Sequence, residues 1–172
     1  MTSFVLELAM NLFGPERLAG GIFADICAGS GLVGFEAVSR GAELAFMVEA
    51  DSRQARQLAA TAADWGIREA VTVLRTDARR CFGTIAGKLP EGRRLSMVFL
   101  DPPFIPGMAR DLLEALSVAA RRGNLLEPGA LLILRTPDRL DQDPAGPGAE
   151  GLALIEARPA GSAKLWLYRP AE

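Results

Sequence analysis

Histidine is absent from this chain of 172 residues. Its absence removes the commonest general base, every Ser-His or Cys-His catalytic pair and the most frequent metal ligand of proteins. Only two cysteines occur, Cys27 and Cys81, and we interpret both as inert small hydrophobic residues. Two cysteines indicate neither a disulfide framework nor a structural zinc site, so we expect no bound metal and a cytoplasmic location.

Long hydrophobic runs and a strong net charge are missing as well. No stretch reaches the ~18 apolar residues of a membrane span, so no membrane partner is expected. The formal net charge is −2, which argues against binding of bare nucleic acid through a global field. Apolar residues still make up 49% of the chain, enough for a core in which we expect Trp65 and Trp166. The sequence therefore predicts one domain over residues 1–172, and we expect a monomer.

Apolar runs alternate with segments of helical spacing along most of the chain. Buried strands are predicted at 22–26, 43–50, 70–76, 95–100 and 129–136. The helical segments between them predict βαβ crossovers, hence an α/β fold with a mostly parallel sheet and helices on both faces. Two more predicted strands, 151–158 and 163–169, are separated by only a few residues, which favours an antiparallel hairpin at the sheet edge.

Acidic residues end the first four predicted strands. They are Asp25, Glu49 with Asp51 just after it, Asp77 and Asp101. Ligands of open α/β sheets bind at the carboxyl ends of the strands, so these side chains mark the expected site.

The loop after the first strand has the pattern Gly29-x-Gly31-x-x-Gly34, which alone is a weak signal because glycine turns also serve packing. Glu49, twenty residues after Gly29, could bind ribose hydroxyls, or could simply favour the start of the next helix. This combination fits NAD and S-adenosylmethionine alike. Asp25 favours S-adenosylmethionine, because a carboxylate at this position attracts the ammonium group of that ligand and repels the pyrophosphate of NAD. Asp77 could accept from an adenine amine, or could be only a helix cap.

The segment "DPPF", Asp101 to Phe104, follows the fourth predicted strand. By itself it could be a stiff strand-to-loop turn. At this edge of the sheet it has a chemical use, because the Asp101 carboxylate and a backbone carbonyl of Pro102 or Pro103 can accept the two N–H groups of a base amine. That arrangement directs the nitrogen lone pair toward an electrophilic methyl group, and Phe104 can stack on an unpaired base.

The segments "DICAGSGLVGFEAVSRGA", "VEAD" and "VFLDPPF" closely resemble the RsmD family, bacterial methyltransferases that act on guanine N2 of 16S ribosomal RNA. The resemblance implies a class I methyltransferase fold with a seven-stranded sheet and S-adenosylmethionine as methyl donor. By this likeness Asp25, Ala28, Gly29 and Gly31 line the methionine end of the donor. Glu49 holds the ribose, Asp77 with Ala78 holds the adenine edge, and Asp101, Pro102, Pro103 and Phe104 hold the guanine.

Some positions depart from the family pattern. Cys27 stands where the family usually has phenylalanine, and Thr61 where it usually has asparagine. The family also carries an Arg-Pro-Thr segment upstream of the first strand, whereas residues 1–21 are expected to form only a shortened N-terminal helix. The expected substrate is ribosomal RNA within an assembled or partly assembled small subunit, whose proteins supply part of the docking surface. A DNA amino-methyltransferase and a non-catalytic nucleoside-binding relative remain the alternatives.

Overall fold

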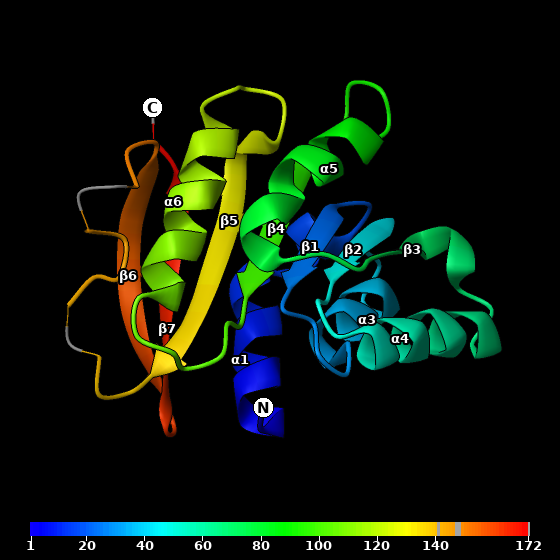
Figure 1. Cartoon of the computed structure of the whole chain (residues 1–172), viewed down its shortest axis with the longest axis horizontal. Coiled ribbons are helices and arrows are strands. Elements are labelled where there is room, and N and C mark those ends of the chain that lie inside the picture. The colour runs from blue at the N-terminus through cyan, green and yellow to red at the C-terminus, as the bar shows by residue number, and fades with distance from the viewer. Residues whose placement is uncertain (141, 147–148, 172) are drawn as a thin grey trace.

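The computed structural model describes residues 1–140, 142–146 and 149–171, so Glu172 at the end of the expected domain lies outside the described residues. Within these residues one sheet of seven strands has the order β3-β2-β1-β4-β5-β7-β6 (Figure 1). The strands are β1 (Ile22–Ile26), β2 (Leu44–Val48), β3 (Val71–Leu74), β4 (Leu95–Leu100), β5 (Leu126–Pro137), β6 (Leu152–Ala160) and β7 (Ala163–Pro170). Strands β1 to β5 pair in parallel, and β7 is antiparallel to both β5 and β6. The predicted fold class, with its C-terminal hairpin, is confirmed.

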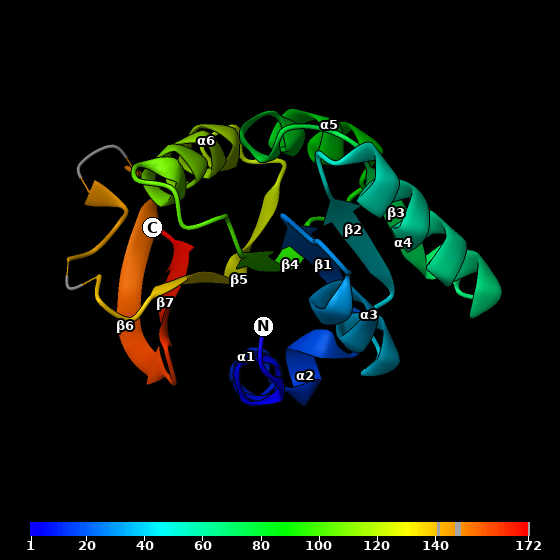
Figure 2. The ribbon, with the colours of Figure 1, turned by 60° about the horizontal axis from the view of Figure 1, so that its bottom comes forward.

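Helices cover both faces of the sheet (Figure 2). They are α1 (Ser3–Phe13), α2 (Pro15–Leu18), α3 (Leu32–Ser39), α4 (Ser52–Asp64), α5 (Cys81–Lys88) and α6 (Met108–Ala120), with short 3-10 turns η1 (Arg68–Ala70) and η2 (Ala78–Arg80). In Figure 2, α1, α2 and α3 lie on one face, whereas α5 and α6 lie on the other. None of the described helices has both the length and the apolar character that a membrane span requires.

Two hydrophobic clusters fill the space between the sheet and the helices. Successive strand residues point to opposite faces, so each strand contributes to both clusters. Phe23 of β1 belongs to a cluster with buried residues of α1, α2, α3 and α4, and we call this side the α1–α4 face. Its neighbours Ile22 and Ala24 pack with α5 and α6 on the α5–α6 face. The interior strands are therefore mostly apolar, as expected for a parallel sheet that is covered on both sides, with Asp25 and Ser96 as buried polar exceptions.

Several element boundaries follow directly from local chemistry. The N-terminus of α4 is capped by Asp51, whose Oδ1 accepts from the backbone N–H groups of Arg53 (3.0 Å) and Gln54 (2.8 Å).

Trp166 is 4% exposed, as predicted, but the prediction for Trp65 is wrong, because this residue is 62% exposed. Trp65 forms the C-cap of α4, beyond the last turn that faces the sheet, and contacts Phe35 edge-on.

Candidate functional site

At the centre of the sheet, the chain segments that follow neighbouring strands lead to opposite faces. Strands β1 and β4 are neighbours although β2 and β3 lie between them in the chain. β1 leads into α3 on one face, and β4 leads into α6 on the other (Figure 2). Such divergence opens a crevice at the carboxyl ends of the two strands, where ligands of open α/β sheets bind. The predicted site residues end or follow β1 to β4 at this edge.

Strand alternation puts the charged members of the site on one face. The last buried apolar residues that β1, β2, β4 and β5 contribute to the α1–α4 face are Phe23, Met47, Phe99 and Ile133. Two positions further along the chain are Asp25, Glu49, Asp101 and Arg135. Because side chains two residues apart in a strand share a face, all four residues lie on the α1–α4 side of the sheet. Glu49, Asp101 and Arg135 lie at the edge, whereas Asp25 pairs with Met47 and Phe99 and so lies one step below them.

Glycines shape the loop that follows β1. Gly31 has a φ of 77°, and a Cβ at this position would collide with two neighbouring side chains. At Gly34 a Cβ would lie 2.6 Å from Met47 and 3.2 Å from Asp25, so glycine lets α3 approach the sheet closely. At Gly29 a Cβ would meet nothing closer than 3.7 Å. The loop backbone at Gly29 is therefore open to a ligand, whereas Gly31 and Gly34 serve the packing.

Asp25 is buried at the base of this loop. It is 1% exposed, and its Oδ2 accepts from the backbone N–H of Gly34 at 2.9 Å. Burial raises the pKa of Asp25 to about 7; the charges of Asp101 and Glu49 also raise it, while the Gly34 hydrogen bond opposes the shift. A cationic ligand group nearby would favour the ionised carboxylate. The environment of Asp25 therefore suits an ammonium group and disfavours a phosphate.

Glu49 connects the glycine loop to the next helix. One carboxylate oxygen accepts from Gly29 N–H at 2.9 Å and the other from Asp51 N–H at 2.8 Å. Each carboxylate oxygen can accept a second hydrogen bond, so ribose hydroxyls could still bind there. Ala28 lies in the same loop, where its N–H donates to Val48 O at 2.9 Å.

Asp77 is held by its neighbour Arg79. Its carboxylate accepts from Arg79 Nε (3.0 Å), Nη2 (2.7 Å) and the backbone N–H (2.8 Å), and it thereby caps η2. The hydrogen bonds from Arg79 lower the pKa of Asp77 to about 2. The helix-cap interpretation of Asp77 therefore describes its contacts within the protein. An adenine amine would have to share this carboxylate with Arg79, beside the buried Ala78.

The Asp101–Phe104 turn leaves several polar groups without a protein partner. The Asp101 backbone N–H donates to Ile26 O at 3.1 Å, which anchors the start of the turn on β1. Pro103 O accepts from Ile105 N–H at 2.7 Å. Within the described part of the chain, no hydrogen bond is found to Pro102 O or to Asp101 Oδ2. Phe104 is 50% exposed. Of the two proline carbonyls considered from the sequence, Pro102 O is thus the one without a hydrogen bond to the described residues.

Arg135 is a member of the site that the sequence did not reveal. Its Nη1 donates to Asp101 Oδ1 at 2.8 Å, and its guanidinium carbon lies 5.2 Å from the centre of the Phe104 ring. The sequence feature that could have indicated it is its charge, because Arg135 lies near the end of the apolar fifth strand "LLILR". That position alone could not identify a partner, since the partner depends on the register between β4 and β5.

Two adjoining cavities occupy this edge of the sheet, and both are lined by Cys27, Gly29 and Asp101. The smaller, of about 220 Å³, also contacts Asp25 and Ala28. The larger, of about 390 Å³, also contacts Glu49, Asp77, Ala78 and Pro103. The structure therefore brings most predicted site residues together. Gly31, Pro102 and Phe104 do not line either cavity.

The site offers no activated thiol and no obvious metal centre. Cys27 has a φ of 67°, which is uncommon for a residue other than glycine and marks the strained start of the loop. Burial, followed by the charge of Glu49, raises the pKa of its thiol to about 12, so the nucleophilic thiolate is strongly disfavoured. Among residues 1–140, 142–146 and 149–171, no cluster of three or more His, Cys, Asp or Glu side chains could bind a metal ion.

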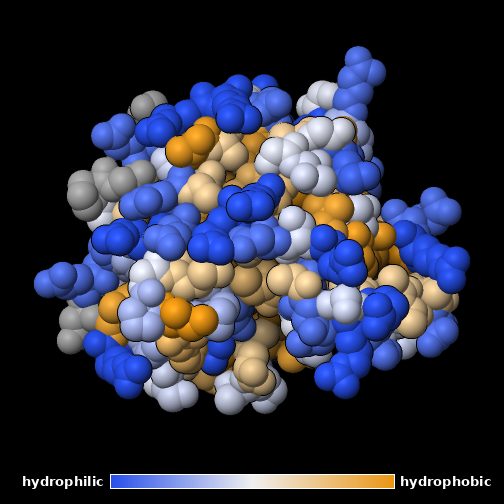
Figure 3. All heavy atoms as spheres, viewed as in Figure 1, coloured by the Kyte–Doolittle hydropathy of each residue, from blue (hydrophilic) through white to orange (hydrophobic). Residues whose placement is uncertain are grey.

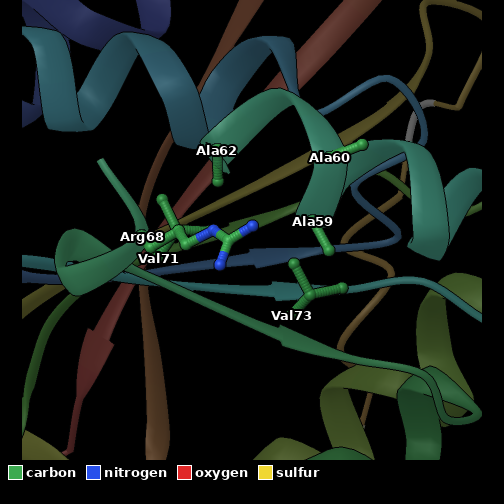
Figure 4. Close-up of a pocket in the computed structure, with 6 residues that line it drawn as sticks. All are labelled: Ala59, Ala60, Ala62, Arg68, Val71 and Val73. Atoms are coloured by element: carbon green, nitrogen blue, oxygen red, sulfur yellow. The ribbon is translucent and has the colours of Figure 1, made fainter. Parts of the chain in front are cut away.

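A further cavity of about 390 Å³ lies away from this edge, between α4 and β3. Figure 4 shows the Arg68 side chain reaching between the alanines of α4 and the valines of β3. The described residues that line this cavity include no carboxylate, hydroxyl or thiol, so they offer no group for acid–base or nucleophilic chemistry. On the face seen in Figure 3, hydrophobic atoms occur in small patches among hydrophilic ones. The edge with Asp25, Glu49 and Asp101 is therefore the candidate site.

Comparison with known proteins identifies the family of the chain. The model of the family described as "Conserved hypothetical protein 95" matches residues 1–169. Among curated proteins, the chain is similar to the candidate rRNA methyltransferase YlbH of Bacillus subtilis (strain 168). The two are 35% identical over 103 residues, which cover 60% of this chain and 54% of that protein. The match thus spans about half the length of this relative.

Solved structures show the same fold. The candidate methyltransferase yhhF of Escherichia coli superposes with a TM-score of 0.77 at 26% identity, over 99% of this chain and 87% of that one. An RNA methyltransferase of Salinibacter ruber, solved in complex with S-adenosyl-L-homocysteine, gives a TM-score of 0.71 at 14% identity. It covers 100% of this chain and 94% of its own.

Proposed function

This chain belongs to the Conserved hypothetical protein 95 family, the RsmD family, and from this premise we propose that it is an S-adenosylmethionine-dependent RNA methyltransferase. The methyl group goes to the exocyclic N2 amine of a guanine in 16S ribosomal RNA. The observation that carries the proposal is the Asp101–Phe104 turn, which presents unpaired hydrogen-bond acceptors beside the glycine loop at the centre of the sheet.

The two cavities fit the two ends of the methyl donor. Ala28, Gly29 and Gly31 provide the loop for its methionine end, and the buried Asp25 carboxylate favours its ammonium group. Glu49 accepts from the ribose hydroxyls while it keeps its bonds to the loop. Asp77 and Ala78 line the wall beside the adenine ring. When bound, S-adenosylmethionine supplies a methyl group that its sulfonium already makes electrophilic, so the protein need not activate it.

Asp101 and Pro102 act on the acceptor amine. The lone pair of an amine attached to a base ring is delocalised, which makes the amine a poor nucleophile. Asp101 Oδ2 and Pro102 O accept its two N–H groups, and this directs the lone pair toward the methyl group. As the N–C bond forms, the S–C bond of the donor would break to leave S-adenosylhomocysteine, and one N–H proton would pass to Asp101 Oδ2. The prolines hold their carbonyls in fixed directions, so little reorganisation is needed during the reaction. Phe104 stacks on the extruded base.

The substrate assignment is supported by the likeness to YlbH, a candidate rRNA methyltransferase, and by the family resemblance of the site motifs. The net charge of −2 provides little long-range attraction to bare RNA. We therefore assign the methylation to RNA within an assembled or partly assembled small subunit, where ribosomal proteins contribute to docking.

The test is methyl transfer to small ribosomal subunits that lack the modification. Purified protein is mixed with isotope-labelled S-adenosylmethionine and one of three acceptors: such subunits, the same RNA without proteins, or duplex DNA. The labelled nucleoside is then identified by mass spectrometry. N2-methylguanosine formed mainly in the subunits supports the proposal. Label in an adenine or cytosine of the DNA, or no label in any acceptor, contradicts it.

A further inference from the structure

Arg135 touches both side chains of the turn that are proposed to handle the target base. Its Nη1 donates to Asp101 Oδ1 at 2.8 Å, and its guanidinium carbon lies 5.2 Å from the Phe104 ring centre. The register between β4 and β5 explains why Asp101 and Arg135 lie side by side. Leu100 of β4 pairs with Leu134 of β5, so the next residue of each strand, Asp101 and Arg135, lies at the same level of the edge.

We infer that Arg135 is a positioning residue for methyl transfer. It binds one oxygen of Asp101 and one face of Phe104, and it thereby orients the other oxygen and the other ring face toward the base. This inference rests on the proposed function, because it assigns Arg135 a task within that reaction. It goes beyond the Asp101–Phe104 motif, since Arg135 lies on a different strand, 34 residues further along the chain.

Stability alone explains this arginine poorly. The side chains of Arg135 and Asp101 are only 17% and 21% exposed, so the pair loses much of its hydration. Arg135 Nε is buried and has no hydrogen-bond partner in the described residues. An unpaired buried N–H group is costly, and an apolar side chain of similar length would avoid that cost. The arrangement therefore favours geometric control of Asp101 over a gain in folding energy.

The hydrogen-bond pattern at Asp101 indicates how this control works. A carboxylate with both oxygens free can rotate about its terminal bond. With Oδ1 bound to Arg135, the orientation of Oδ2 is fixed relative to the two cavities that Asp101 lines. The planar guanidinium suits both contacts, because it donates in a fixed direction and stacks on an aromatic ring. Lysine keeps the positive charge but lacks the planar fork.

The charge of Arg135 indicates that it acts through Asp101 and not on the base. The amine nitrogen gains positive charge as it attacks the methyl group, so a cation close to it would oppose the reaction. Asp101 lies between the two in the proposed arrangement, since its Oδ1 faces Arg135 and its Oδ2 faces the amine. Removal of Arg135 should therefore impair the orientation of Asp101 and leave donor binding unchanged.

Two variants and a matched control test this role. Arg135→Met removes the guanidinium, Arg135→Lys keeps the charge, and Arg93→Met is the control. Arg93 also makes a short ion pair, 2.7 Å to Glu43 Oε2, and it precedes β4 at the opposite edge of the sheet. Each variant is measured for S-adenosylhomocysteine affinity, RNA KM and single-turnover rate of methyl transfer at a temperature where it is folded.

We expect Arg135→Met to lower the single-turnover rate by about 10- to 100-fold, with donor affinity unchanged, because small misplacements of a reacting group cost rates of this order. Arg135→Lys should recover part of the rate, and Arg93→Met should keep all of it. In an Asp101→Asn background, Arg135→Met should have little further effect on the rate. If Arg135→Met does not fold, the comparison of Arg135→Lys with wild type carries the test.

An active wild-type protein with equally active Arg135 variants would overturn the role of Arg135 and leave the proposed function intact. Loss of S-adenosylhomocysteine affinity in the Arg135 variants would also overturn it. A wild-type protein that transfers no methyl group to any acceptor would instead refute the proposed function, and the role of Arg135 with it.

Discussion

The two halves of the site differ in how their polar groups are satisfied. In the cofactor half, both oxygens of Glu49 accept from backbone N–H groups, Asp77 is bound by Arg79, and Asp25 Oδ2 accepts from Gly34 N–H while its Oδ1 has no hydrogen bond among the described residues. In the Asp101–Phe104 turn, Asp101 Oδ2 and Pro102 O have no hydrogen bond among the described residues, and half of Phe104 is exposed. The first half is largely formed by contacts within the protein, whereas the second presents unused acceptors and an open ring.

This difference indicates a division of labour. Substitutions in the cofactor half should change stability and donor affinity together, because the same groups serve the fold and the ligand. Substitutions in the Asp101–Phe104 turn should change methyl transfer with little effect on donor affinity.

The largest stability effect is expected from Asp25. Its pKa of about 7 in the folded protein lies above the ordinary value of 3.8, so the folded state holds a proton that the unfolded chain has released. The free energy of unfolding should therefore fall as the pH rises toward 7, by about 2–3 kcal/mol between about pH 5 and about pH 8. Urea titrations of the ligand-free protein across this range measure the decline.

Asp25→Asn should flatten this decline, because asparagine can still accept from Gly34 N–H but cannot ionise. Asp51→Asn is the control. Asp51 is a fully exposed helix cap with a lowered pKa, so it stays ionised in both states across this pH range. An equal decline in Asp25→Asn and wild type would contradict the assignment.

Glu49→Ala should weaken S-adenosylhomocysteine binding by about 2 kcal/mol, the loss expected for hydrogen bonds to a charged group. Glu49→Gln should lose less, because its amide oxygen still accepts. Isothermal titration of each folded variant gives the affinities, with Glu43→Ala as a control at the opposite edge of the sheet. Unchanged affinity in Glu49→Ala would remove Glu49 from the ribose site.

The smallest effect is expected for Phe104→Ala, which should weaken engagement of the RNA by about 1 kcal/mol through loss of one stacking contact. Donor affinity and thermal stability should stay close to wild type, since the ring is half exposed. Ile105→Ala, at an adjacent residue that is 61% exposed, is the matched control. RNA KM values that respond equally to both substitutions would argue that the ring has no specific role.

Much of this architecture could be predicted from the sequence, because it depends on local patterns. Apolar runs identified β1 and β4 at their observed bounds. The glycine loop and the strand-end acids converge because parallel strands bring their carboxyl ends to one edge. The role of Arg79 as partner of Asp77 could not be predicted, since a side chain two residues away has many accessible rotamers.

Features that depend on strand register or on the detailed geometry of a turn could not be predicted from the sequence. The contact between Asp101 and Arg135 depends on the register of β4 against β5, which includes an irregularity between Leu95 and Met97. The choice between the Pro102 and Pro103 carbonyls depends on the bond from Ile105 N–H, a detail of turn geometry. Trp65 was misplaced because helical spacing does not reveal where a helix leaves the sheet.

The most direct test of the division of labour is one sample of Asp101→Ala, measured for melting temperature, S-adenosylhomocysteine affinity and single-turnover methyl transfer to small subunits. We predict a folded protein that binds the ligand almost as tightly as wild type. Its methyl transfer should be slower by roughly 100-fold or more, comparable to the loss of one preorganised polar contact. Asp101→Asn should lose less. A folded, ligand-binding Asp101→Ala protein with a near-normal transfer rate would contradict the account.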